Sequence, residues 1–120
     1  MLAPSNVRTR IMNDTEFHTR ATAILDAIEA QADHWFEKLD LDVETKRNGN
    51  VLNLIFENGH QVVINSQAPL HEMWLAARSG GFHYRFDGSH WKDTRGGTDL
   101  HQALSNICSE ATGKTLTVEL

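Results

Sequence analysis

The chain has 120 residues, 40% hydrophobic content and a formal net charge of -5, enough apolar material for one core and one domain. Its 11 basic residues are scattered, which argues against nucleic acid as a partner because phosphate binding needs grouped Lys and Arg. No apolar run approaches the roughly 20 residues that span a bilayer, so no membrane partner is expected. The single cysteine, Cys108, cannot form an internal disulfide, and we therefore expect a reduced, cytoplasmic setting.

The first 11 residues differ from the rest of the chain. They contain basic side chains and no acid, and Met12-Asn13-Asp14 follows them. We interpret residues 1–11 as a disordered extension or an alternative start, and we expect residues 12–120 to form a single domain.

The first predicted element is a helix from Asp14 to about Glu37. Its apolar residues recur at steps of three and four, which is the period of an amphipathic helix. Asn13 or Asp14 can cap its N-terminus. The predicted buried face consists of Phe17, Ala21, Ile24, Leu25, Ile28, Ala32, Trp35 and Phe36.

The pattern then changes to alternation of apolar and polar residues, which is typical of strands. Strands are expected near 40–47, 50–57 and 60–65, joined by hairpin turns at Asn48-Gly49 and Asn58-Gly59. Further short strands are expected at 72–77, 82–86 and 90–93. A second helix should begin at Thr98 and stop at Gly113, and the tail after it could lie along the helices.

This order of elements predicts an α+β fold. Two helices would pack on one face of an antiparallel sheet of five to seven strands, giving a two-layer α-β sandwich. The other face of the sheet would be left to solvent or to a partner.

Acidic residues are concentrated at the start of the domain. Of the 16 carboxylates, nine fall between Asp14 and Glu44, where Arg20 and Lys38 are the only basic residues. At 100° per residue, four of them form a helical stripe about 80° wide that His18 extends, and three alternate along the first strand. The stripe contains Asp26, Glu29, Asp33 and Glu37, the strand row contains Asp40, Asp42 and Glu44, and together with Asp14, Glu16 and His18 they form what we call the acidic ridge.

A solvated helix face is the simplest interpretation of the ridge. Against it, like charges three or four residues apart repel, and almost no Lys is interleaved to offset the repulsion. We therefore expect the ridge to attract cations or a basic partner surface. Oxygen ligands suit Fe²⁺, Fe³⁺ and other divalent cations such as Mn²⁺, Mg²⁺ and Ca²⁺. Carboxylates on a convex helix cannot converge into a cage, so binding should be weak and exchangeable.

A resemblance to a known family rests on the segment from Val63 to Trp91. It contains an Ile-Asn-x-Gln-x-Pro run, then Trp-Leu-Ala, Ser-Gly-Gly-aromatic and Asp-Gly-x-x-Trp. Together with the sequence from Met12 to His18 and Phe56-Glu57-Asn58-Gly59, this segment resembles the frataxin family and is similar to its bacterial type. The resemblance covers residues 12–112 in unbroken order.

The resemblance implies an α-β sandwich that acts in iron–sulfur cluster assembly. Members bind iron weakly through acids of the first helix and strand, and they bind the cysteine desulfurase and the scaffold protein. The metal-binding pattern carries over at Asp14, Glu16, His18, Glu29, Asp33, Asp40, Asp42 and Glu44, whereas Asp26 and Glu37 join it through the helical stripe alone.

The resemblance also implies a partner-binding surface on the sheet, at Asn65, Gln67 and Trp74. In the predicted strand Val63 and Asn65 share a face opposite Val62 and Ile64, which suits an exposed Asn. From the sequence alone, a core position is the more usual interpretation of Trp74, and the resemblance reverses it. Where eukaryotic members carry a basic residue after the Gly-rich turn, this chain has His83, so partner binding there would depend on pH.

The expected function is that of a non-enzymatic regulator or adaptor of iron–sulfur cluster assembly, since no nucleophile–base pair has local support. The alternative is an iron-handling protein with ferroxidase or storage activity in an oligomer. A third hypothesis is an acidic interaction domain that binds no metal. A monomer is expected, with an iron-dependent oligomer as the other state.

Overall fold

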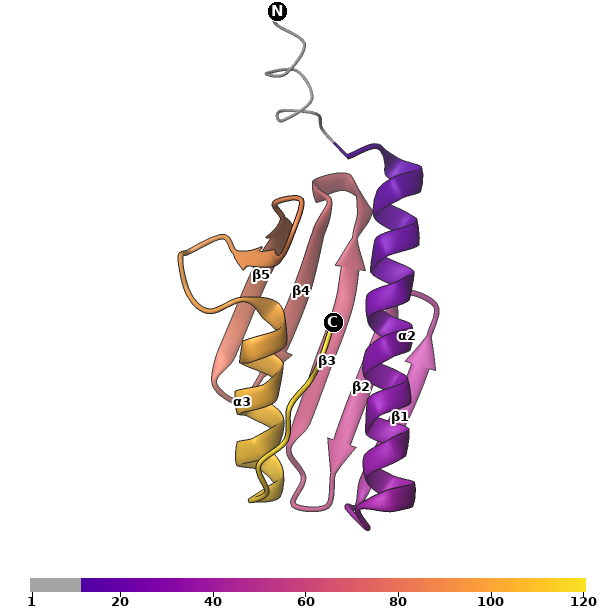
Figure 1. The fold of residues 1–120 in the computed structure, drawn as a ribbon, viewed down its shortest axis with the longest axis vertical. Coiled ribbons are helices and arrows are strands. Elements are labelled where there is room, and N and C mark those ends of the chain that lie inside the picture. Colours follow the sequence, from indigo (N-terminus) through magenta and orange to yellow (C-terminus); the bar gives the residue numbers. More distant parts are fainter. Residues whose placement is uncertain (1–11) are drawn as a thin grey trace, which may run out of the picture.

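The computed structural model describes residues 12–120, so the interpretation of residues 1–11 lies outside the described part. Helix α2 (Asp14–Lys38) comes first, six strands follow, and helix α3 (Leu100–Thr112) comes after them. Both helices lie on the same face of the sheet (Figure 1). The predicted two-layer α+β sandwich is confirmed, with a six-stranded sheet. No helix within residues 12–120 is long and apolar enough to cross a membrane.

The six strands follow one another across the sheet in sequence order, and each pairs antiparallel with its neighbours. A short 3₁₀ turn, η1 (Ala68–Leu70), joins the third strand to the fourth. Gly49 turns the first hairpin with φ of 60°, as the Asn-Gly pair predicts. The strands are β1 (Val43–Asn48), β2 (Val51–Phe56), β3 (Gln61–Gln67), β4 (Glu72–Ala77), β5 (Gly80–Phe86) and β6 (Trp91–Asp93).

Helix α2 forms where its periodicity predicts. The side-chain oxygen of Asn13 accepts a hydrogen bond from the Glu16 amide at 2.8 Å, which caps the first turn. The predicted apolar face is buried except at its last residue, Phe36, which is 57% exposed. Phe36 directly follows the buried Trp35, and a step of one residue turns a side chain 100° away from the core.

The core lies between the helices and the inner face of the sheet. Leu52 and Leu54 of β2, Ile64 of β3 and Met73 of β4 are completely buried. Their neighbours along each strand point to the outer face and are less buried, for example Asn65 and Trp74. The outer face of the sheet therefore carries no covering layer within residues 12–120 (Figure 1).

Several predicted boundaries were wrong: for example, β3 runs on to Gln67 instead of ending at residue 65, and β5 begins at Gly80 instead of residue 82. The first strand begins at Val43 instead of residue 40, because the chain uses the preceding residues to end α2. Asp40 adopts a left-handed φ of 55°, and the Leu41 amide donates back to the Trp35 carbonyl at 3.2 Å. The second helix begins at Leu100 rather than Thr98, with Asp99 at the N-cap position.

The C-terminal tail runs between α2 and α3 (Figure 1), as the sequence suggested. The side chain of Gln31 pairs with the backbone of Glu119, donating to its carbonyl at 2.8 Å and accepting from its amide at 2.9 Å. On the other side, the Ser105 hydroxyl accepts from the Val118 amide at 2.8 Å. The tail thus closes the gap between the helices. Cys108 of α3 is completely buried, and this burial raises the pKa of its thiol to about 12.

Candidate functional site

The acidic ridge divides into three parts along α2. At the N-terminal end, Asp14 is 92% exposed and one of its oxygens lies 2.7 Å from Nε2 of His71. His71 in turn stacks on Phe17 with ring centroids 5.0 Å apart. His18 is exposed in the same part of the helix. Sequence reasoning did not identify His71 as a neighbour of this end, because 57 residues separate it from Asp14.

In the middle of the ridge, a cation from the sheet offsets part of the negative charge of the acids. Nη1 of Arg47, on β1, lies 2.9 Å from Asp26 and 3.1 Å from Glu29. Its Nε donates to the Gly49 carbonyl at 2.8 Å, which holds the side chain in place. The expectation that almost no base offsets the charge of the stripe is therefore wrong for this part. It considers only residues of the helix, whereas Arg47 lies on β1.

The C-terminal part of the ridge collects the remaining acids. Asp33 accepts a hydrogen bond from the Thr45 hydroxyl at 3.2 Å. The other four carboxylates have neither an ion pair nor a hydrogen bond within residues 12–120, and all are exposed: Glu37, Asp40, Asp42 and Glu44. Only Glu44 lies on β1, so the predicted strand row of three acids is wrong; the other two lie in the connection that ends α2.

The two ends of the ridge cannot serve one metal ion. Asp14 and Asp33 are 19 residues apart on α2, which corresponds to about 28 Å at 1.5 Å per residue. Within residues 12–120, no group of three or more His, Cys, Asp or Glu side chains is placed to hold a metal ion. The arrangement suits separate, solvent-exposed cation contacts.

The predicted partner-binding residues meet on the outer face of the sheet. Asn65 of β3 is paired with Trp74 of β4, and Trp74 is paired with His83 of β5, so these three form one row across the strands. Gln67 extends the patch and donates to the Asn65 side chain at 3.1 Å. Trp74 lies opposite the core residues of its strand, so the alternative of a core tryptophan is wrong.

Glu72 is a residue of this patch that sequence reasoning missed. It occupies the row beside Trp74, between Gln67 and Arg85, and is only 4% exposed. Its carboxylate accepts from Nε1 of Trp74 at 2.9 Å and from Nε of Arg85 at 2.8 Å. We call these six residues the sheet patch: Asn65, Gln67, Glu72, Trp74, His83 and Arg85.

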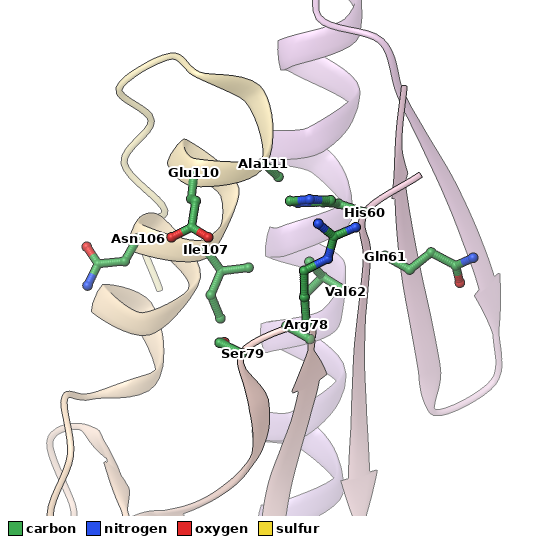
Figure 2. A pocket seen from close by; sticks show the side chains of 10 residues that line it. His60, Gln61, Val62, Arg78, Ser79, Asn106, Ile107, Glu110 and Ala111 are labelled. Carbon is green, nitrogen blue, oxygen red and sulfur yellow. The ribbon is translucent and has the colours of Figure 1, made fainter. Parts of the chain in front are cut away.

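The cavities among residues 12–120 differ in their relation to these surfaces. One of about 220 Å³ includes Asp42 of the ridge in its lining. Another of about 220 Å³ opens between α3 and the ends of β3 and β4. Figure 2 shows the Arg78 side chain extended beside His60, with Glu110 on the facing helix. None of the predicted site residues lines this cavity.

A shallow depression of about 120 Å³ lies on the sheet patch, beside Asn65 and Trp74. Its shape suits contact with a surface rather than enclosure of a small molecule.

Known proteins resemble this chain along most of its length. The model of the frataxin-like domain matches residues 10–114. The chain is 59% identical over 109 residues to the iron-sulfur cluster assembly protein CyaY of Bordetella parapertussis, covering 91% of this chain and 100% of that protein. It is 50% identical over 107 residues to the CyaY of Cupriavidus necator, covering 89% and 96%.

Solved structures give the same result for the fold. Frataxin from Psychromonas ingrahamii superposes with a TM-score of 0.73 at 32% identity, covering 91% of this chain and all of that one. Yeast frataxin superposes with a TM-score of 0.70 at 23% identity, covering 92% and 90%. A trimeric yeast frataxin, solved as a ferrous complex, has a TM-score of 0.64 at 23% identity and covers 88% and 90%. The chain belongs to the frataxin family, and within it to the bacterial CyaY type.

Proposed function

We propose that this protein is a non-enzymatic regulator or adaptor of iron–sulfur cluster assembly that binds iron weakly. The observation that carries the proposal is the 59% identity to a protein named for cluster assembly, across the whole of that protein's length. The two surfaces described above then have separate roles, one for cations and one for partner proteins.

Iron would bind mainly at the C-terminal part of the acidic ridge. Glu37, Asp40, Asp42 and Glu44 offer exposed carboxylates, and oxygen ligands suit Fe²⁺ and Fe³⁺. Asp33 can add a ligand, whereas the pairing with Arg47 makes the middle of the ridge a poorer site. Asp14, Glu16 and His18 would form a second, separate contact. Each contact supplies few ligands and stays open to water, so other divalent cations should compete.

The partners would be the cysteine desulfurase and the scaffold protein of the assembly machinery. A basic surface on either would meet the ridge, and the sheet patch would provide the second contact. Tryptophan is one of the residue types enriched among binding hot spots, and Asn65, Gln67 and His83 surround Trp74 with polar groups. An aromatic anchor within a polar rim is the usual composition of such an interface.

The proposal is tested by the affinity of the purified protein for purified cysteine desulfurase and scaffold at about 0.05 M and about 0.5 M salt. Replacing both Glu37 and Asp42 with Lys should weaken binding at low salt, while Glu110→Lys, an exposed acid on α3, should not. Trp74→Ala should weaken binding about tenfold or more at either salt concentration. Wild-type binding that none of these substitutions changes would overturn the proposed surfaces.

Iron binding has its own test. In an anaerobic Fe²⁺ titration followed by amide NMR, signals near Glu37 and Asp42 should broaden first, and those near Asp26 later. Mn²⁺ should broaden the same signals, because the ligands are simple carboxylates. Broadening spread evenly over the molecule, or none at all, would contradict the assignment of the ridge.

The second candidate is an iron-handling oligomer with ferroxidase or storage activity. One observation favours it, the ferrous complex of a trimeric yeast frataxin of the same fold. Sedimentation with and without Fe²⁺ in air, together with the rate of Fe²⁺ oxidation, separates the two candidates. An iron-dependent oligomer that oxidises Fe²⁺ catalytically would replace the adaptor proposal.

A further inference from the structure

Glu72 is a buried carboxylate on a sheet face that no other layer of residues 12–120 covers. On β4, Met73 and Leu75 point into the core, so Glu72 and Trp74 point to the outer face. Its burial therefore comes from side chains of the same face rather than from the core. A carboxylate rarely occupies such a position unless donors satisfy both of its oxygens.

Both oxygens have a donor. Oε1 accepts the indole N–H of Trp74 at 2.9 Å, and Oε2 accepts Nε–H of Arg85 at 2.8 Å. Nδ1 of His83 lies 3.5 Å from Oε1. The side chain of Arg85 is 65% exposed, so Arg85 compensates the buried charge of Glu72 while remaining largely in water.

These contacts hold the indole of Trp74 on two sides. Glu72 holds its polar edge, and the imidazole of His83 stacks on its face with centroids 4.2 Å apart and planes 4° apart. An indole on an open sheet face otherwise samples several rotamers, and a partner would have to order it on binding. Here the aromatic pair already has one defined orientation.

We propose that Glu72 is a positioning residue of the sheet patch: its carboxylate holds the indole of Trp74 against His83 and so forms the aromatic surface before a partner arrives. The effect on binding rests on the proposed function, in which Trp74 contacts the assembly machinery. The effect on the indole concerns the free protein and does not depend on any partner.

The first experiment uses the free protein. The chain has three tryptophans, so ¹H–¹⁵N spectra contain three indole signals, and Trp35 and Trp91 act as internal references. In Glu72→Gln the Trp74 signal should move upfield, because an amide oxygen is a weaker acceptor than a carboxylate and cannot serve both donors. Glu44→Gln removes an exposed carboxylate from β1 and should leave all three signals in place.

A second variant keeps the proposal testable if Glu72→Gln does not fold. Glu72→Asp keeps the charge but is one methylene shorter, so it cannot reach both donors without moving, and the Trp74 signal should shift again. An unchanged Trp74 signal in every folded Glu72 variant overturns the proposal, as does an equal shift in Glu44→Gln.

The second experiment measures binding to the cysteine desulfurase. Glu72→Gln should raise the dissociation constant about tenfold, equivalent to about 1.4 kcal/mol. Trp74→Phe keeps a ring but lacks the N–H, so adding Glu72→Gln to it should change the affinity little further. An undiminished effect of Glu72→Gln in the Trp74→Phe protein refutes the positioning role. If Trp74→Ala leaves binding intact, the proposed docking surface fails, while the indole spectra still decide the role of Glu72.

Discussion

Replacing Arg47 with Met should destabilise the protein and at the same time expose the middle of the acidic ridge to cations. The Arg47 side chain is only 20% exposed, and its Nη1 and Nε contact Asp26, Glu29 and the Gly49 carbonyl. Met retains an unbranched apolar chain, so most of the packing of the stem is kept and the loss is chiefly electrostatic.

The size of the loss follows from the exposure of each partner. Asp26 is 63% exposed, so its pair with Arg47 is worth only a few tenths of a kcal/mol. Glu29 is 33% exposed and Gly49 offers a backbone carbonyl, and each of these contacts should contribute about 1 kcal/mol. The free energy of unfolding of Arg47→Met should therefore fall by about 2 kcal/mol in total.

Urea denaturation at neutral pH and low salt measures this loss. The matched control is Lys46→Met, which removes the same charge from the exposed face of the same strand and should change stability by less than about 0.5 kcal/mol. Salt should reduce the difference between wild type and Arg47→Met, because screening weakens the contacts with the acids. Equal losses in the two variants, or no loss in Arg47→Met, would refute the assignment of these contacts as stabilising.

The same variant tests whether Arg47 masks a cation site. In a Mn²⁺ titration of Arg47→Met, amide signals around Asp26 and Glu29 should broaden at lower metal concentration than in the wild type. Signals near Asp42 should respond at an unchanged concentration, because Arg47 makes no contact there. If the signals around Asp26 and Glu29 respond as they do in the wild type, Arg47 is not what limits cation binding in the middle of the ridge.

Three further substitutions probe the fold. Gly113 ends α3 with φ of 72°, so Gly113→Ala should cost about 1 kcal/mol in thermal unfolding. Ser105→Ala leaves the buried Val118 amide without its acceptor and should cost about 1–3 kcal/mol in the same assay. Burial raises the pKa of Cys108 from about 9 to about 12, so the folded state keeps a proton that the unfolded state loses in this range. From Cys108 alone, stability should fall as pH rises from about 9 to about 12, with a slope approaching 1.4 kcal/mol per pH unit. Cys108→Ala should flatten this slope only in part, because burial and Asp93 also raise the pKa of Tyr84 to about 12.

Local patterns explain why most of the fold could be predicted from the sequence. The buried face of α2 repeats at helical period, and Leu52 and Leu54 alternate with half-buried neighbours on β2. Gly49 is the residue type that a tight hairpin requires at positive φ. Each of these signals comes from residues that are close together in the sequence, so it can be recognised without knowing how the elements pack.

The partners of Arg47 and Glu72 depend on register and could not be predicted in the same way. Arg47 meets Asp26 only because β1 lies beside α2. Glu72 meets Arg85 because β4 and β5 turn over two residues, Arg78 and Ser79, so that Ala77 pairs with Gly80. The glycines at 80 and 81 suggested a longer loop, and the expected strand began at 82. If a two-residue turn at 78–79 is assumed instead, counting outward from the turn along both strands pairs Glu72 with Arg85.

The ion pairs of Arg47 and Arg85 also set how the two surfaces differ electrostatically. Arg47 offsets one of the two carboxylate charges in the middle of the ridge, so the acids without a cation partner concentrate where α2 meets β1. Arg85 neutralises Glu72, so the sheet patch presents an aromatic pair with little net charge. Contacts made by the ridge should therefore weaken steeply with salt, whereas contacts made by Trp74 should persist. A partner held by both surfaces would lose only the ridge's share of its affinity at high salt, and that share should vanish in the Glu37 and Asp42 charge reversal.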